Sequence, residues 1–109
     1  MEPIEVFQKS KGDAAAYWEF TVLIGHDSKD VGFLVKIERS HWEELTDGRV
    51  SPEHLIKKSF QFLLKKHRGV KYAIWRDFDL RQIQRSFPEY RDEMRKAARR
   101  TIGFGMFSS

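Results

Sequence analysis

The segment from Ser51 to His67 constrains the fold most, because it specifies one amphipathic helix with signals at both ends. Ser51 can accept hydrogen bonds from the first free N–H groups, and Pro52 suits the first helical position, where no backbone donor is needed. Basic residues at the far end favour the negative end of the helix dipole, and Gly69 is a suitable left-handed terminator. The segment therefore predicts a main helix over about 52–67.

Large apolar side chains cover a broad arc of this helix, roughly 200° wide at about 100° per residue. They belong to Leu55, Ile56, Phe60, Phe62, Leu63 and Leu64. An arc of this width suits a helix that packs against a sheet and is flanked by another helix. The remaining face is rich in lysine and lacks acidic residues, which is typical of a solvated surface.

Two segments before the main helix, at about 16–24 and 31–39, alternate between apolar and more polar side chains. Alternation with period two, rich in aromatic and β-branched residues, is typical of half-buried strands. The short polar connection between them predicts an antiparallel hairpin or small sheet. An isolated hairpin is only marginally stable, so its apolar face needs the main helix as a cover. The sequence thus predicts an α+β fold.

The N-terminal segment is specified less strongly. Ile4, Val6 and Phe7 fit either a short strand or a packed arm, within a candidate flexible arm over 1–14. Between the hairpin and the main helix, Ser40 and Glu43 match a capping box. This pattern predicts a short connecting helix that ends at Asp47-Gly48 and places Trp42 at one end of the core.

The chain after Gly69 admits two interpretations over 70–78. Its alternating apolar residues suit a strand, whereas the four-residue spacing of Ile74 and Phe78 suits a helical turn. We favour the turn, because the segment that follows is helical. Further helices are predicted over about 80–87, with Asp79 as a cap, and over about 89–99, with Pro88 forcing a break between them.

The tail over 101–109 is apolar and follows a basic helix. It fits either a frayed terminus or an apolar strand that pairs with a sheet edge. The candidate residues for self-association are Ile102, Phe104, Met106 and Phe107.

Composition limits the class of protein. The length predicts a single domain over 1–109, and 40% hydrophobic residues argue against disorder. The absence of cysteine excludes disulfides, a thiol nucleophile and a cysteine zinc site. No apolar run approaches a membrane span, and no signal peptide is visible, so we expect a soluble, cytoplasmic protein that does not bind membranes.

Charge is distributed unevenly along the chain. Residues 1–50 hold six Lys and Arg against ten Asp and Glu, whereas residues 51–109 hold fourteen against six. A basic half can attract polyanions, and two opposed halves can attract each other between copies of the chain. The candidate polyanion-binding residues are Lys57, Lys58, Lys65, Arg91, Arg95, Lys96, Arg99 and Arg100.

Signs of catalysis are absent from the sequence. The four histidines are dispersed without metal-ligand spacing, and we expect each to be a surface or cap residue; they are His26, His41, His54 and His67. No nucleophile elbow and no phosphate-cradling glycine loop occurs. We therefore expect a protein that is not an enzyme and has no metal, cofactor or small-molecule ligand.

Two functions remain after these exclusions. The first is a non-enzymatic interaction module that self-associates as a homo-oligomer, because the apolar positions outnumber those that one hairpin and three helices can cover. The alternative is nucleic-acid binding through the basic helix faces of the C-terminal half, although no RNP1, KH or helix-turn-helix signature is present.

Two segments carry a resemblance to known proteins. The first is the pattern Ser51-Pro52-Glu53-x-Leu55-Ile56-x-x-Ser59-Phe60-x-Phe62-Leu63-Leu64. The second is Phe78-Asp79-Leu80-x-x-Ile83-x-x-x-Phe87-Pro88-Glu89-Tyr90. The chain over roughly 17–96 resembles a group of small single-domain prokaryotic proteins of unassigned function. The resemblance implies a hairpin followed by helices, and it implies no activity.

Overall fold

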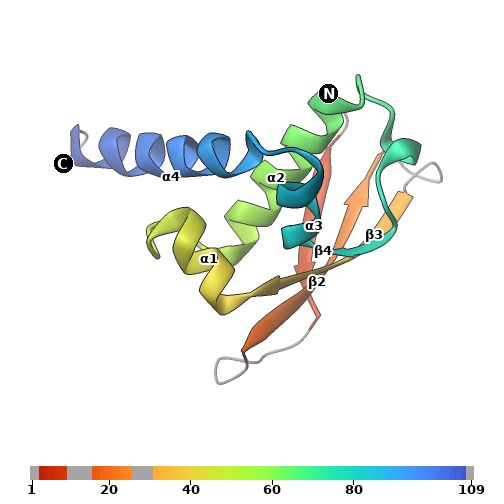
Figure 1. The fold of residues 1–109 in the computed structure, drawn as a ribbon, viewed down its shortest axis with the longest axis horizontal. Coiled ribbons are helices and arrows are strands. Elements are labelled where there is room, and N and C mark those ends of the chain that lie inside the picture. The colour runs from red at the N-terminus through yellow and green to blue at the C-terminus, as the bar shows by residue number, and fades with distance from the viewer. Residues whose placement is uncertain (1–2, 10–15, 26–30, 108–109) are drawn as a thin grey trace.

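A mixed β-sheet with helices packed on one of its faces forms the described part of the chain (Figure 1). The computed structural model describes the backbone of residues 3–9, 16–25 and 31–107, and the side chains in these ranges up to residue 100. Its strands and helices are β1 (Ile4–Gln8), β2 (Tyr17–Ile24), β3 (Val31–Glu38), α1 (Arg39–Thr46), α2 (Pro52–Lys66), β4 (Asp77–Asp79), α3 (Leu80–Ser86) and α4 (Tyr90–Phe107). The predicted α+β fold is confirmed.

The strands lie side by side in the order β1-β2-β3-β4. As predicted, β2 and β3 form an antiparallel pair, in which Phe20 lies opposite Val35. β1 adds an antiparallel edge strand to β2, so the expectation of a flexible arm is wrong for residues 4–8. Residues 1–2 and 10–14 of that arm, and residues 26–30 between β2 and β3, lie outside the described residues. The other edge is β4, which runs parallel to β3 with Phe78 opposite Val35.

The core lies between the inner face of the sheet and α2. Alternate residues of β2 and β3 are buried, as the sequence pattern predicts. From α2, Phe60 and Leu63 are both fully buried. The Phe60 ring centroid lies 5.2 Å from that of Phe33 and 5.7 Å from that of Phe78. The main helix therefore covers the hairpin and also reaches the edge strand β4.

Both ends of α2 agree with the sequence signals. The His54 N–H donates a hydrogen bond to Ser51 Oγ at 3.1 Å, and Pro52 occupies the first turn. After the helix, Gly69 has a φ of 82° and its N–H donates to the Leu64 carbonyl at 2.7 Å. This left-handed residue satisfies a carbonyl that the helix leaves free.

The capping box predicted for α1 is wrong. The helix begins at Arg39, and Glu38 occupies the cap position without a side-chain hydrogen bond. Residue 39 still belongs to the sheet ladder, because its N–H donates to the Ala16 carbonyl at 2.8 Å. Since β3 passes directly into α1, Ser40 is already inside the helix. The predicted end is confirmed, because Asp47 adopts a left-handed conformation there.

The segment over 70–78 combines the two conformations that its sequence left open. A 3₁₀ turn over Lys71–Ala73 agrees with the favoured helical turn. Phe78 instead belongs to β4, because the exposed edge of β3 pairs with this segment and Leu34 N–H donates to the Arg76 carbonyl at 2.7 Å. Asp79 then caps α3 as predicted, accepting from the Arg81 N–H at 2.9 Å.

α4 is longer than predicted and runs to Phe107. The expectation of a frayed terminus or a strand over 101–109 is therefore wrong for the backbone up to residue 107; residues 108–109 lie outside the described residues. Gly103 and Gly105 each disfavour a helix by about 1 kcal/mol relative to alanine, but no proline interrupts it. The end of α4 extends beyond the other helices (Figure 1).

Candidate functional site

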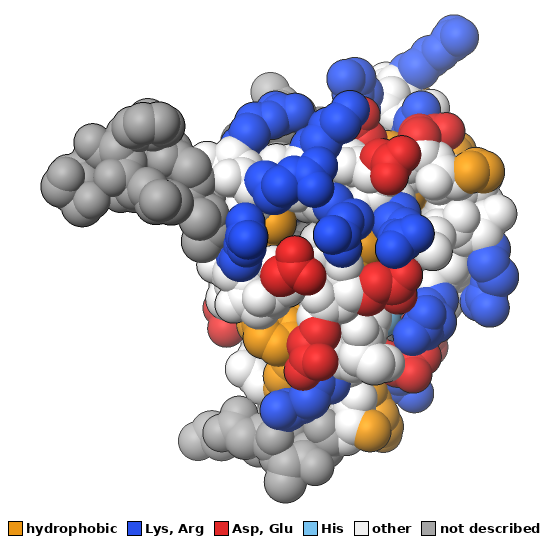
Figure 2. Space-filling model, turned by 60° about the vertical axis from the view of Figure 1, so that its left-hand side comes forward, with side chains coloured by type: hydrophobic (Ala, Val, Ile, Leu, Met, Phe, Trp, Pro, Cys, Tyr) orange, Lys and Arg blue, Asp and Glu red, His pale blue; other side chains and the backbone are white. Residues whose placement is uncertain are grey.

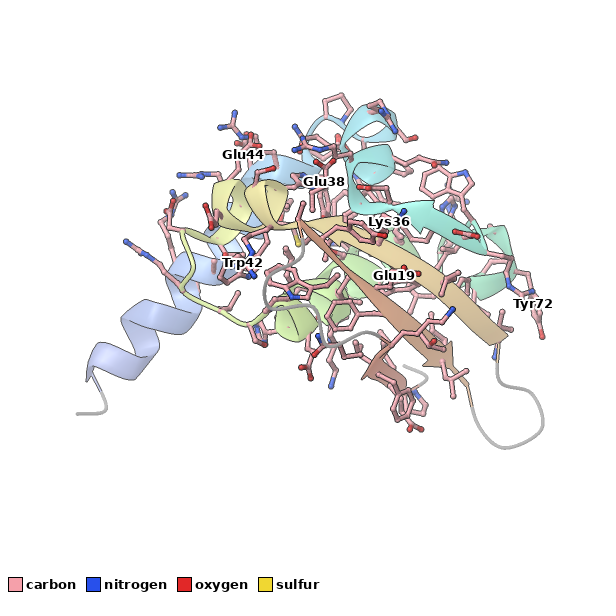
Figure 3. All side chains as sticks on the ribbon, turned by 90° about the horizontal axis from the view of Figure 1, so that it is seen from below. Glu19, Lys36, Glu38, Trp42, Glu44 and Tyr72 are labelled. Atoms are coloured by element: carbon pink, nitrogen blue, oxygen red, sulfur yellow. The ribbon has the colours of Figure 1, made fainter. Side chains whose placement is uncertain are left out.

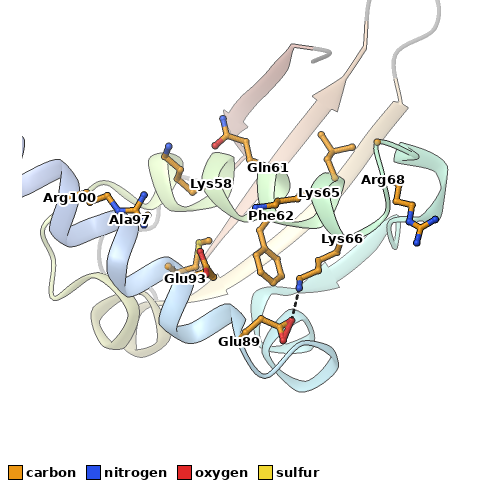
Figure 4. Close-up of a pocket in the computed structure, with 13 residues that line it drawn as sticks. Lys58, Gln61, Phe62, Lys65, Lys66, Arg68, Glu89, Glu93, Ala97 and Arg100 are labelled. Carbon is orange, nitrogen blue, oxygen red and sulfur yellow. Dashed lines mark ion pairs between the residues drawn. The ribbon is translucent and has the colours of Figure 1, made fainter.

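A groove with a volume of about 1250 Å³ lies between α2 and α4 (Figure 4). We call it the α2–α4 groove. Its floor contains the nearly buried side chains of Phe62, Leu64 and Met94. Its walls are formed by Lys58, Gln61, Lys65, Lys66, Arg68 and Gly69 on the α2 side, and by Glu89, Glu93, Ala97 and Arg100 on the α4 side.

A buried hydrogen bond fixes the two walls relative to each other. Ser59 of α2 and Tyr90 of α4 are fully buried, and their hydroxyl oxygens are 2.6 Å apart. Ser59 Oγ also donates to the Leu55 carbonyl at 2.7 Å, which leaves the Tyr90 hydroxyl to donate to Ser59 Oγ. Burial raises the pKa of the Tyr90 phenol, and the contact with Ser59 opposes this shift. The phenol therefore remains protonated and able to donate.

Charge is distributed asymmetrically around the groove. On the α2 side, Lys58, Lys65 and Arg68 form no ion pair with any described residue. The α4 side is mixed, because it carries Glu93 together with Arg100. Lys66 Nζ bridges the walls by pairing with Glu89 Oε1 at 3.2 Å (Figure 4). The wall along α2 is therefore positive, and the opposite wall is close to neutral.

His54 lies on α2 close to Lys57 and Lys58, whose charges bear on its pKa. Burial is the main cause that lowers the pKa of His54 below 6.5, and the charges of Lys58 and Lys57 lower it further. A cationic imidazole is disfavoured beside two ammonium groups. The lysine face of α2 thus carries an electrostatic potential that favours anions.

Only part of the predicted polyanion-binding set meets at the groove. Lys58, Lys65 and Arg100 line it. Arg91 and Arg95 instead face α1, and the remaining members, Lys57, Lys96 and Arg99, are exposed and do not line the groove. Figure 2 shows Lys and Arg side chains gathered on the upper part of one face, with Asp and Glu side chains among and below them. The basic helix faces are therefore interrupted by carboxylates.

The two arginines that turn away from the groove bind acidic residues near α1. Arg91 Nε lies 3.4 Å from Glu44 Oε1, and Arg95 Nη2 lies 3.8 Å from Asp47 Oδ2. Arg95 also donates to the Glu44 carbonyl. These pairs join the acidic and basic halves of the sequence within one chain. That arrangement leaves fewer charges for attraction between copies.

The sequence interpretation missed Lys66 and Arg68 as groove residues. From the sequence, both belong to the basic residues that favour the negative end of the helix dipole. Their place in the groove depends on the return of the chain to α2, where Tyr90 meets Ser59 and Glu89 pairs with Lys66. That return is a tertiary contact, and no local sequence pattern contains it.

His41 contradicts the expectation that each histidine is a surface or cap residue, since it is fully buried between α1 and α3. Its Nε2 lies 3.0 Å from Gln84 Oε1, while Nδ1 has no hydrogen-bond partner within the described part of the chain. Burial is the main cause that lowers the pKa of His41, and Arg81 adds to it. The contact with Gln84 and the charges of Glu44 and Asp79 oppose the shift.

Metal coordination finds no support in this region. Among the described residues, no three His, Asp or Glu side chains are grouped so that they could hold a metal ion. His26 lies outside the described residues. For His41, the sequence signal of burial is its four-residue spacing from Leu45, which places the two side chains on one helix face.

A second surface feature lies beyond the end of α2. Tyr72 is 70% exposed and Val70 is 52% exposed, the highest values among the large apolar side chains described. Tyr72 lies far from Trp42 and Glu44 (Figure 3). On the sheet, Glu19 and Lys36 lie opposite each other in the register of β2 and β3 (Figure 3). The outer surface of the sheet thus carries opposite charges at this pair of residues.

Comparison with protein-family models, curated proteins and solved structures finds no match to the chain. The resemblance noted from the sequence therefore stays a prediction. Among the described helices, none has both the length and the apolar character that crossing a membrane requires. A function must be inferred from the geometry of the α2–α4 groove itself.

Proposed function

We propose that this protein is a non-enzymatic interaction module that binds a protein partner on the α2–α4 groove. The observation that carries the proposal is the combination of an apolar floor, formed by Phe62, Leu64 and Met94, with rim cations that have no ion pair among the described residues. Such a combination of apolar centre and charged edge is typical of protein interaction sites.

The charges on the rim of the groove favour a protein partner over a nucleic acid. Affinity for a nucleic-acid backbone rises with the number of phosphates that Lys and Arg side chains neutralise, so carboxylates among the cations weaken it. Here Glu89 and Glu93 lie on the α4 wall, and Glu89 already neutralises Lys66. Arg91 and Arg95 are engaged with acidic residues of the N-terminal half. The groove is therefore better suited to a partner that buries apolar side chains.

Self-association is part of the same proposal. The sequence places Ile102, Phe104, Met106 and Phe107 on the last turns of α4, whose backbone extends beyond the other helices (Figure 1). A projecting helix end that is rich in apolar residues is favoured to associate with a second copy. We therefore expect the homo-oligomer to form through this segment, and we expect a cytoplasmic location.

The experiment is a sedimentation measurement of molar mass across a range of protein and salt concentrations. We expect a dimer or larger species that dissociates when Phe104 and Phe107 are both replaced by Ser. Phe7→Ser is the matched control, because it removes an exposed ring from the other end of the chain. A monomer at every concentration refutes self-association.

Nucleic-acid binding is the second candidate, and one observation favours it. Lys58, Lys65, Arg68 and Arg100 surround one groove without ion pairs among the described residues. Binding of mixed-sequence RNA and DNA that weakens steeply with salt supports this candidate. Affinity that does not depend on salt contradicts it.

A further inference from the structure

We infer that the partner segment in the α2–α4 groove is an amphipathic helix whose carboxylates lie along α2. This inference rests on the proposed function, because it takes the groove to be a protein-binding face. It adds the conformation, the length and the charge pattern of the occupant.

The conformation follows from the hydrogen bonds of the walls. Both walls are helices, α2 and α4, whose backbone groups are bonded within each helix. An extended peptide would therefore find no backbone partners and would leave polar groups unpaired against the apolar floor. A helix satisfies its own backbone, so it can lie in such a groove with only its side chains in contact.

The length follows from the span of the lining residues. On α2 they run from Lys58 to Lys66, a rise of about 12 Å at 1.5 Å per residue. On the α4 side they run from Glu89, just before the helix, to Arg100, about 16 Å by the same measure. A helix of about eight to eleven residues, or two to three turns, spans this distance.

The charge pattern follows from the asymmetry between the walls. Lys58 and Lys65 lie seven residues apart on one side of α2, and Arg68 lines the groove just beyond the end of the helix. Carboxylates on one flank of the occupant would meet these cations. The same carboxylates placed against α4 would meet Glu93. The acidic flank is therefore expected on the α2 side, with neutral or basic residues on the α4 side.

The experiment measures the fluorescence anisotropy of a labelled synthetic peptide with the full chain. The peptide has 14 residues, with Leu at helical positions i, i+4 and i+7, Glu along one flank, and Ala and Gln elsewhere. The control peptide has Lys in place of each Glu. We expect saturable binding of the acidic peptide, and at least about fivefold weaker binding of the Lys peptide.

Variants of the chain locate the site. The double variant K58Q/K65Q should weaken binding of the acidic peptide about fivefold, because it removes two exposed charge contacts. K57Q is the matched control: Lys57 is exposed on α2 but does not line the groove, so affinity should change less than about twofold. Circular dichroism of each variant confirms that it is folded.

Three outcomes overturn the inference. They are no saturable binding of the acidic peptide, an equal loss of affinity in K57Q and K58Q/K65Q, and preferential binding of a 14-nucleotide single strand that displaces the peptide. Self-association, the other part of the proposed function, is judged separately by sedimentation. A chain that dimerises but does not bind the peptide supports self-association and overturns this inference. A monomer that binds the peptide supports this inference and refutes self-association.

Discussion

The buried hydrogen bond between Ser59 and Tyr90 provides the sharpest test of the packing of α2 against α4. Its two hydroxyls are completely buried, and each can be removed with a small change of shape. Tyr90→Phe deletes one hydroxyl but leaves Ser59 bonded to the Leu55 carbonyl. Ser59→Ala has a different effect, because it leaves the Tyr90 O–H buried without its acceptor.

The magnitudes follow from this asymmetry. Tyr90→Phe should lower the free energy of unfolding by about 1 kcal/mol, which is typical of one lost hydrogen bond. Ser59→Ala should lower it by about 2–3 kcal/mol, since an unsatisfied buried donor carries its full desolvation cost. The double variant should lose about 2 kcal/mol, because neither hydroxyl is then left unpaired.

Urea denaturation of the four proteins completes a double-mutant cycle. The expected coupling free energy is about 1–2 kcal/mol. Effects of the two single variants that simply add would refute the assignment of Tyr90 as donor to Ser59. A Tyr90→Phe variant that loses more stability than Ser59→Ala would refute it equally.

Three further predictions concern stability. Phe60→Ala should lower the free energy of unfolding by about 3–5 kcal/mol because this ring is fully buried, whereas Phe7→Ala should change it by under about 0.5 kcal/mol; equal losses in urea titrations contradict the assigned core. The free energy of unfolding should fall as pH drops below about 6.5, because unfolded His41 takes up a proton that the folded chain, with its lowered pKa, binds less readily. His41→Gln should make the free energy of unfolding depend less on pH below about 6.5, and the dependence that remains should come from His54, whose pKa is also lowered. An unchanged pH dependence in this variant speaks against the buried imidazole as the cause. Gly69→Ala should cost about 1 kcal/mol through backbone strain alone, because φ is 82° and no atom lies within 4 Å of the added Cβ; a variant as stable as the parent in urea rules this out.

Local signals predicted most of the fold correctly. The alternation before Gly25, the cap at Ser51 and the arc around Phe60 each depend on neighbours close in sequence, and the structure confirms them. The edge strands were harder to predict. β4 has only three residues, and its conformation is decided by pairing with β3, which sequence periodicity over 70–78 cannot reveal.

The groove was predicted only in part, for a physical reason of the same kind. Helical periodicity places Lys58 and Lys65 on one face of α2, but it does not say which helix lies beside them. The partners of Arg91 and Arg95 come from α1, which is distant in sequence, so their charges seemed available for a ligand. Tertiary packing thus determines which basic side chains have no acidic partner among the described residues.

The parallel pairing of β4 with β3 sets an order of events during folding. Residues 77–79 pair with residues 34–36 across a stretch of chain that contains both α1 and α2. Closing so long a loop is opposed by chain entropy, and three residues of strand offer little to compensate for it. The hairpin of β2 and β3 should therefore form early, while this edge assembles last and is the first part of the sheet to exchange its amide protons with solvent.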